Sequence, residues 1–572
     1  WNVYGSAYQN LGQFDLAESA FKKALSLNPN FSEASYNLAG CLRSQGRLSE
    51  ARDSIARSLQ QDENFFEAYF ALGNILVEEG QKDEAIIAFK RVTAINPDHS
   101  PSHNNLGILL HELGFFRESL DHYSKALKLR PDFDKCHFNL GKLYRDLENL
   151  GEATKSFLKA IELNTTFDEA RYELASLLPN IAFSYYSTEI AHAFLDILEK
   201  KSIVSPITIA RSILELLSWH PNIKKPLEVH EEPMDADKLA ASLEALSESQ
   251  LLLTIMKTCP LPDLHYERLF TRLRREVLLQ NQNFSSSASI LKFCIGLALQ
   301  CYINEHIYIT TPEEEEALKN LVQELKEKLS NKVTIDPLSL VTILMFKRID
   351  QLDFVINYEF PDSLTELNQR LIVEPLRESE LGRNMYALGI VSNLVSKEVR
   401  DQYEENPYPI WLQVGQAPTK KSLANFIQSQ GLRIHHNQIA EIQTPRILIA
   451  GCGTGQHAIQ VSSRFENSNL TAIDLSRASL SYAKRKTQEA KISNIQYILL
   501  DILQVSNLDT NFDIIESIGV LHHLEEPSEG LNALTDQLKP GGLMCLGLYS
   551  TIARHELNQI RNKYVENLPV SR

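Results

Sequence analysis

The sequence predicts a multidomain protein of class α + α/β, with an array of helical hairpins, a helical middle region and a doubly wound α/β domain. Three observations predict this. A period of about 34 residues runs from position 1 to position 178, apolar residues recur at helical spacing from 179 to 395, and strand and helix patterns alternate from 446 to 549. The length of 572 residues agrees, because it predicts three or four domains.

The composition is that of an ordinary globular protein, with 43% hydrophobic and 23% charged residues, which excludes a disordered or collagenous chain. Only 23 Gly and 22 Pro occur, and a largely helical chain tolerates that scarcity best. The net charge of −16 disfavours nucleic acid as a partner, since an acidic surface repels phosphate backbones.

Cysteine usage and hydropathy bear on the compartment. The seven cysteines are scattered without a CxxC pair, which argues against a disulfide framework or a metal site and favours the reducing cytoplasm. No run of 18 apolar residues occurs, so we expect no transmembrane helix.

The N-terminal repeat shows in columns one period apart, without insertion or deletion over five periods. Small residues fill two columns and a large apolar residue fills a third. These columns are Gly5/Ala39/Gly73/Gly107/Gly141/Ala175, Ala17/Ala51/Ala85/Ser119/Ala153 and Phe21/Ile55/Phe89/Tyr123/Phe157. We expect the small residues to let the two helices of a hairpin approach closely, and the large residue to fill the gap to the next hairpin.

This pattern resembles the tetratricopeptide repeat over residues 1–178, as five repeats and a capping helix. Trp1 falls at the fourth repeat position, so we expect the chain to be clipped at its start. Asn37, Asn105 and Asn139 share one column, which in this fold faces the concave groove. They look like the asparagine ladder of arrays that bind peptide backbones, which implies a protein or peptide partner; otherwise Asn is only a common residue at this position.

The middle region, 179–395, has no repeat and no histidine pair at ligand spacing. Thr311 followed by Pro312 predicts the capped start of an amphipathic helix reaching Lys328. The Pro-rich, charged stretch His220–Asp237 predicts an exposed linker.

The last region, 396–572, predicts five strands at Arg446–Ala450, Leu470–Asp474, Ile495–Asp501, Phe512–Ser517 and Leu543–Tyr549. The first runs into Gly451-Cys452-Gly453-Thr454-Gly455, and helices separate most of the others. This order specifies a doubly wound sheet whose ligand lies at the carboxyl ends of the strands.

The glycine spacing is G-x-G-x-G, and Gln456 replaces the third glycine of a dinucleotide fingerprint. Asp474 and Asp501 end the second and third strands. Two carboxylates here suit a nucleoside without pyrophosphate, because one can accept both ribose hydroxyls and the other the exocyclic amine of adenine.

This stretch resembles the class I S-adenosylmethionine-dependent methyltransferases, which are Rossmann-like. The resemblance implies S-adenosyl-L-methionine as cofactor. By the resemblance, the glycine loop binds it and Asp474 holds its ribose. Further contacts are implied along the loop and the next strand ends, so the full set is Gly451, Cys452, Gly453, Gly455, Asp474, Leu475, Asp501, Ile502 and Ser517, with Ile518 beside Ser517 at the methyl-donor end.

The segment Ile514–Pro527 resembles the small-molecule and quinone-type branch of these enzymes, where a similar His-His-Leu follows the fourth strand. His523 or His522 could act as a base if the acceptor carries a proton. Otherwise one ring is packed and the other caps a loop. Glu516 and Glu525 have the nine-residue spacing of the paired glutamates of protein arginine methyltransferases, but their surroundings do not match that family.

The run Gln402–Trp411 resembles the segment before the methyltransferase domain in bacterial tetratricopeptide–methyltransferase fusions, where Tyr403 and Tyr408 would form a lid or substrate wall. The whole layout resembles those fusions. Class I domains have seven strands, and Ser550–Arg572 looks helical, so we expect an incomplete domain. The main hypothesis is a methyltransferase acting on a protein or small molecule; the alternative is an interaction scaffold with an inactive domain.

Overall fold

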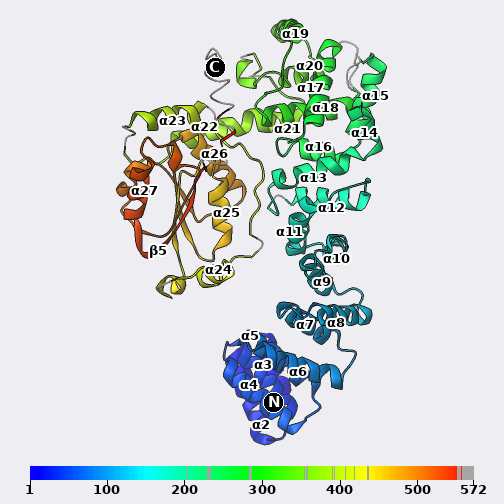
Figure 1. The fold of residues 1–572 in the computed structure, drawn as a ribbon, viewed down its shortest axis with the longest axis vertical. Coiled ribbons are helices and arrows are strands. Elements are labelled where there is room, and N and C mark those ends of the chain that lie inside the picture. Colours follow the sequence, from blue (N-terminus) through cyan, green and yellow to red (C-terminus); the bar gives the residue numbers. More distant parts are fainter. Residues whose placement is uncertain are drawn as a thin grey trace. The chain divides into compact units, whose positions relative to one another are not determined.

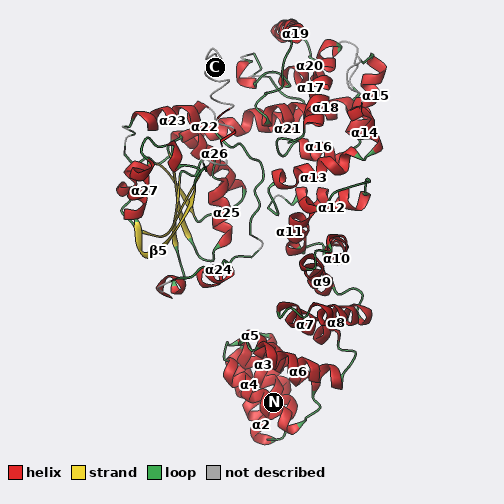
Figure 2. Cartoon of the chain, viewed as in Figure 1, coloured by secondary structure: helices red, strands yellow, loops and turns green. Residues whose placement is uncertain are grey.

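The computed structural model describes residues 1–200, 202–228, 234–281, 287–352, 354–355, 358–389, 391, 393–405, 407–417, 419–434, 437–550, 555–556 and 559. The chain forms two compact units, Trp1–Leu178 and Pro179–Arg572. Figure 1 shows a series of helices in the first unit and further helices in the second, and Figure 2 shows that the strands gather in one sheet near the C-terminal end of the chain.

The first unit is a series of helical hairpins. Second helices begin at the same position of each repeat, from Phe14 to Leu150, and so do first helices from Ser32 to Asp168, as the sequence period predicts. The helices are α1 (Asn2–Asn10), α2 (Phe14–Leu27), α3 (Ser32–Ser44), α4 (Leu48–Gln61), α5 (Phe66–Glu78), α6 (Lys82–Ile95), α7 (Ser100–Glu112), α8 (Phe116–Leu129), α9 (Asp134–Asp146), α10 (Leu150–Leu163) and α11 (Asp168–Leu177).

The glycine column packs on the aromatic column of the same hairpin. A Cβ on Gly73 would lie 2.6 Å from the Phe89 ring, and a Cβ on Gly107 would lie 2.5 Å from the Tyr123 ring. The large residue is expected to fill the gap to the next hairpin, and the structure adds a second contact inside its own hairpin. The ring fills the space inside its own hairpin because glycine leaves that space open, and the same cores also continue into the following hairpin.

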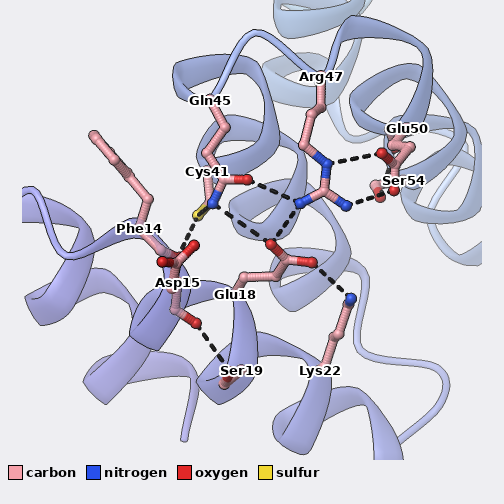
Figure 3. Close-up of polar contacts among 10 residues, drawn as sticks. All are labelled: Phe14, Asp15, Glu18, Ser19, Lys22, Cys41, Gln45, Arg47, Glu50 and Ser54. Carbon is pink, nitrogen blue, oxygen red and sulfur yellow. Dashed lines mark hydrogen bonds and ion pairs between the residues drawn. The ribbon is translucent and has the colours of Figure 1, made fainter.

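Polar side chains link the first two hairpins (Figure 3). Arg47 donates to Glu18 at 2.7 Å and to Glu50 at 2.6 Å, and Lys22 donates to the other Glu18 oxygen at 2.6 Å. These two cations lower the pKa of Glu18, with the Lys22 hydrogen bond as the largest cause. One repeat later Arg52 occupies the place of Glu18 and pairs with Glu79 at 2.9 Å, so an ion pair again links the two hairpins, with the cation now on the second helix of the earlier one.

The second unit begins with a helical region. Its helices are α12 (Thr188–Glu199), α13 (Pro206–Ser218), α14 (Pro221–Glu228), α15 (Ala236–Ser247), α16 (Gln250–Met256), α17 (Leu264–Leu279), α18 (Ala288–Ile303), α19 (Pro312–Ser330), α20 (Pro337–Leu344), α21 (Thr365–Asn368), α22 (Glu374–Arg383), α23 (Leu394–Glu405) and α24 (Leu423–Ser429). Thr311 forms the predicted cap, as a full capping box with Glu314. The predicted linker is wrong in part, because α14 forms there and buries Ile223 and Pro226.

A parallel five-stranded sheet of order β3-β2-β1-β4-β5 follows, which confirms the predicted doubly wound α/β class. Its elements are β1 (Arg446–Ala450), α25 (Gln456–Arg464), β2 (Asn469–Asp474), α26 (Arg477–Glu489), β3 (Ile495–Leu499), β4 (Phe512–Ile518), α27 (Pro527–Asp536) and β5 (Leu538–Gly547).

Alternate strand residues face two separate cores. Ile447 and Ile449 pack with α25 and α26 on one face, and Leu448 and Ala450 pack on the other face with Leu534 of α27. Figure 1 shows α25 and α27 on opposite sides of the strands.

Two differences from the sequence prediction concern the end of the chain. β5 begins at Leu538 rather than Leu543, because Leu538 already pairs with Phe512, after which the register shifts and Leu543 pairs with Ile514. Most of the predicted helical segment Ser550–Arg572 lies outside the described residues.

The middle region and the α/β domain are in contact across the predicted boundary at residue 395. Arg485 of α26 is 2% exposed and pairs with Glu374 at 3.1 Å and Glu378 at 2.7 Å, both on α22. The boundary itself stays a prediction. None of the helices in the described ranges combines the length and apolar content that crossing a membrane requires.

Candidate active site

The glycine turn after β1 has a left-handed backbone at three positions, with φ of 74° at Gly451, 51° at Gly453 and 81° at Gly455. The N–H groups of Gly451 and Cys452 both donate to the Ile473 carbonyl at 2.9 Å, which ties the turn to β2. A Cβ on Gly451 would lie 2.5 Å from the Val520 side chain. Glycine is therefore needed both for the backbone conformation and for space.

Asp474 at the end of β2 holds this turn. One carboxylate oxygen accepts the Gly453 N–H at 2.7 Å and the other accepts the Ser476 N–H at 2.9 Å. Burial raises the pKa of Asp474, although these two hydrogen bonds oppose the shift. Each oxygen keeps lone-pair capacity for a further donor.

Asp501 follows β3 and is 3% exposed. Its Oδ1 accepts the Leu503 N–H at 2.9 Å, which caps the short helix Ile502–Asn507. The other oxygen remains available to a ligand donor. Ile502 is buried beside it, so a carboxylate and an apolar side chain meet at the carboxyl end of β3.

The helix α23 lies against this end of the sheet and is anchored by Glu404. The Glu404 carboxylate accepts the N–H groups of Arg477 at 2.6 Å and Ala478 at 3.0 Å, in the first turn of α26. The Ser476 hydroxyl donates to the Tyr403 carbonyl at 2.9 Å. A carboxylate at a helix N-terminus is favourable because it meets unpaired N–H groups and the positive end of the dipole.

The segment after α23 reaches the glycine turn itself. The Thr454 hydroxyl donates to the Pro409 carbonyl at 2.5 Å, and the Trp411 indole donates to the Thr454 carbonyl at 3.1 Å. Tyr482 of α26 donates to the Trp411 carbonyl. The predicted pre-domain segment thus packs on the turn, except Asn406, which lies outside the described residues.

These elements enclose a cavity of about 540 Å³. Both lid candidates, Tyr403 and Tyr408, line it, together with Val399 of α23. Burial raises the pKa of Tyr403, and the charge of Asp474 adds to the shift. The volume lies within the range typical of small-molecule and cofactor sites.

Most of the predicted cofactor residues meet at this cavity. Its walls include Gly451, Cys452, Gly453, Asp474, Leu475, Asp501, Ile502 and Ile518. Gly455 and Ser517 do not line it. Gly455 lies beneath the turn against Ala483, and Ser517 is fully buried on the α27 face, because side chains alternate along β4 and Ile518 takes the cavity side. The assigned roles stay predictions.

The two predicted histidines differ. His523 is exposed and lines the cavity, whereas His522 does not line it. The His522 ring instead lies between His523 and Tyr549, with ring centroids 4.2 and 4.1 Å away. A packed ring at His522 is the arrangement that the non-catalytic interpretation expects.

A second histidine at the cavity, His457, was not predicted from the sequence. Its Nε2 lies 2.7 Å from a carboxylate oxygen of Glu516, a buried residue of β4. Arg464 donates to the other oxygen of Glu516 at 2.9 Å. Glu516 is therefore paired with His457 and Arg464 rather than with Glu525. Both contacts depend on the packing of α25 on β4.

The residues present fit S-adenosylmethionine. The cavity offers two carboxylates on neighbouring strand ends, a glycine turn that forms part of its wall, and apolar walls at Leu475 and Ile502. Asp474 would hold ribose hydroxyls and Asp501 the adenine amine. When bound, the cofactor would supply an electrophilic methyl group. Among the described residues, no three His, Cys, Asp or Glu side chains are grouped to hold a metal ion.

Each of the three predicted ladder asparagines donates to an asparagine of the preceding repeat that lies in another column. Asn37 donates to Asn2 at 3.0 Å and Asn139 donates to Asn104 at 3.1 Å, each across one repeat. Asn105 donates to Asn74 at 3.2 Å in the same way. A separate cavity of about 250 Å³ is lined by Asn37, Asn74 and the aromatic side chains of Tyr36 and Phe70.

Comparison with known proteins agrees with both regions. Residues 447–542 match the family described as methyltransferase domain. Residues 5–64, 42–106 and 134–167 match tetratricopeptide repeat families. The chain thus carries tetratricopeptide repeats at its N-terminus and a methyltransferase domain near its C-terminus, and the predicted fusion of the two is confirmed.

Similar proteins include several methyltransferases. A malonyl-[acyl-carrier protein] O-methyltransferase of Paenibacillus is 27% identical over 22% of this chain and 46% of its own length. A mitochondrial ubiquinone biosynthesis O-methyltransferase of Schizosaccharomyces pombe is 32% identical over 19% of this chain and 38% of its own. An uncharacterized protein of Synechococcus is 38% identical over 21% of this chain and 29% of its own. The chain thus spans well under two thirds of each of these relatives.

Solved structures similar to part of the chain include MamA, 27% identical, which covers 29% of this chain and 96% of its own at a TM-score of 0.27. A tetratricopeptide protein of Thermus thermophilus is 25% identical and covers 31% of this chain and 96% of its own, also at a TM-score of 0.27.

Proposed function

We propose that this protein is an S-adenosylmethionine-dependent methyltransferase whose repeat array binds a protein or peptide, either as the methyl acceptor or as a scaffold. The observation that carries the proposal is the cavity where the glycine turn is held by Asp474 and faces Asp501. Methyl transfer is an in-line displacement at a sulfonium, so positioning is its first requirement. The cavity provides such positioning by rigid strand ends and a covering helix, α23.

The groove supports the second half of the proposal. The NH₂ groups of Asn37, Asn105 and Asn139 are engaged by neighbouring repeats, which fixes the amide planes. Their carbonyl oxygens keep lone-pair capacity to accept the N–H groups of an extended peptide. We also propose the cytoplasm as the location, since seven free cysteines suit a reducing compartment.

The test of cofactor binding is Asp474→Asn. We expect the affinity for S-adenosylhomocysteine, measured by calorimetry on the full chain, to fall about 10- to 100-fold, because charge-assisted hydrogen bonds to the ribose are lost. Asp509→Asn is the matched control, since Asp509 is exposed on the loop before β4. Equal affinity in both variants would remove Asp474 from the site.

The acceptor class is tested by incubating the wild-type chain with methyl-labelled S-adenosylmethionine and a cell lysate. Labelled protein bands that disappear when Asn37, Asn105 and Asn139 are replaced by Ala would support a protein acceptor held in the groove. Label only in the small-molecule fraction would support a metabolite. Intact S-adenosylhomocysteine binding without any label would instead support the scaffold with an inactive domain.

A further inference from the structure

His457 of the first turn of α25 is paired with a buried carboxylate at the edge of the cofactor cavity. Its Nε2 lies 2.7 Å from Glu516 Oε2, and the Glu516 side chain is only 4% exposed. Arg464, seven residues after His457 on the same helix, completes the cluster by an ion pair with the other Glu516 oxygen at 2.9 Å. The imidazole itself is 28% exposed and lines the cavity.

Glu516 is present as a carboxylate. Burial alone would raise its pKa, but the hydrogen bond from His457 and the charge of Arg464 outweigh burial, so the pKa of Glu516 is lowered. A carboxylate accepts and cannot donate, so Nε2 of His457 carries a proton and donates it. The pairing therefore leaves Nδ1 as the ring nitrogen that can take up a proton.

The pair lies at the end of the cavity where β4 finishes. Glu516 and Ile518 are two residues apart on one strand and therefore share a face, and Ile518 lines the same cavity as His457. Asp474 and Asp501, the predicted partners of the nucleoside, end the strands on the other side of β1. His457 therefore lies toward the end of the cavity that is proposed to hold the methyl group of the cofactor.

We propose that His457, oriented by Glu516, is the base that takes the proton of the methyl acceptor, and that the acceptor is a hydroxyl group rather than a carboxylate. This inference rests on the proposed function. The acceptor oxygen forms a bond to the methyl carbon, the carbon–sulfur bond of the sulfonium breaks with its electron pair going to sulfur, and the hydroxyl proton goes to Nδ1 of His457. A carboxylate acceptor carries no proton at neutral pH and would need no such base.

The charged and titratable groups around the pair are few enough to name. His457 contacts the Glu516 carboxylate directly, and Arg464 contacts the other oxygen of the same carboxylate. Cys545 of β5 is the register partner of Glu516. The remaining titratable groups that line the cavity are Tyr403, Tyr408, Cys452, Asp474, Asp501, His523 and Tyr549. Among these, His523 is the competing base.

The experiment compares His457→Gln, Glu516→Gln and His523→Gln in the full chain. His192→Gln is the matched control, because His192 is exposed on α12, outside the cavity. Two quantities are measured: the calorimetric affinity for S-adenosylhomocysteine and the rate of label transfer to a lysate between pH 5 and 9. The labelled product is then treated with mild alkali.

For His457→Gln we expect affinity within about threefold of wild type and a rate at least 100-fold lower, as for loss of a general base. For Glu516→Gln we expect unchanged affinity and a rate at least 10-fold lower, because the imidazole loses the carboxylate that orients it. The label should survive alkali, since methyl ethers resist hydrolysis that removes methyl esters.

Several outcomes would overturn the inference. An affinity loss in His457→Gln as large as the rate loss would make His457 a cofactor ligand, and an unchanged rate would exclude it as a base. Loss of the acidic limb only in His523→Gln would assign the base to His523. Alkali-labile label would exclude the hydroxyl acceptor. A wild-type chain that binds S-adenosylhomocysteine but transfers no label would refute the proposed function, and the base with it.

Discussion

The turn glycines of the repeat array and those of the α/β domain differ in what surrounds them. In the array, Gly12, Gly46, Gly80 and Gly114 make the same left-handed turn in four successive hairpins, and a Cβ at any of them would meet no atom within 4 Å. In the cofactor turn, Gly451, Gly453 and Gly455 lie close together in sequence, yet each would place a Cβ in a different environment.

The difference shows which residue roles a sequence pattern can reveal. An array position is defined by its neighbours within one or two repeats, so one role recurs along the chain and periodicity reveals it. A position in the active site is defined by strands that are distant in sequence, so equal residues in one motif have unequal tasks. The predictions that follow test that contrast.

The largest effect is expected in the cofactor turn. A Cβ on Gly455 would lie 2.6 Å from the Ala483 Cβ and 3.1 Å from the Ala483 Cα of α26, whereas a Cβ on Gly453 would meet only the Tyr408 carbonyl at 3.3 Å. Gly455→Ala should therefore weaken S-adenosylhomocysteine binding at least 100-fold, about 3 kcal/mol. Gly453→Ala, the control with the same substitution, should lose about tenfold or less. Equal losses would show that the turn glycines are as interchangeable as those of the array.

The same contrast explains how well each of the two regions could be predicted from the sequence. The period predicted a series of hairpins without their helix bounds, and the observed second helices do begin at matching positions of successive repeats from Phe14 onward. In the α/β domain, β1 was predicted with its observed bounds, but β5 begins at Leu538, earlier than predicted, because the register between β4 and β5 shifts between Phe512 and Ile514. Asp474 and Asp501 were found because strand ends are visible in sequence.

The His457–Glu516 pair was not found, because nothing in the sequence marks which helix face meets which strand. Residues 457 and 516 are 59 positions apart and meet only when α25 packs on β4. The Glu404 cap of α26 is a similar case, joining residues 73 positions apart. Such contacts follow from tertiary packing rather than from local patterns.

A smaller effect is expected where one repeat departs from the others. His122 stands in a column otherwise filled by Ala20, Ser54, Ala88 and Ser156. Its Nδ1 lies 3.0 Å from that of His103, and burial, followed by the charges of His103, Lys125 and Lys90, lowers its pKa to about 4, with only Asp121 opposing.

A histidine with a lowered pKa stabilises the fold above the pKa of about 6.5 in the unfolded chain, and that stability is lost as the pH falls toward 4. The α7–α8 hairpin should thus lose about 1 kcal/mol between pH 7 and pH 5, allowing for solvent around the ring. His122→Ser, the residue of two other repeats, should reduce this loss, and the remainder is expected from His99 and His103, whose pKa values burial also lowers. Hydrogen exchange of α7 and α8, corrected for its intrinsic pH dependence, measures it, and an undiminished loss in the variant would assign the effect to other groups.

The smallest effect is expected at Glu148, which takes the place of the turn glycine in the fifth hairpin with a φ of 59°. Left-handed backbone is unfavourable for a residue with a Cβ, so Glu148→Gly should stabilise this hairpin by about 1 kcal/mol. Gly114→Ala, the reverse change one repeat earlier, should destabilise its own hairpin by a similar amount. Hydrogen exchange of α9 and α10, against α7 and α8, separates the two. If the turns are interchangeable, the two substitutions change the stability of their hairpins by equal and opposite amounts. A loss of stability on Glu148→Gly would mean that the Glu148 side chain makes a contact that the other turns lack. The array, too, would then contain positions that its period does not describe.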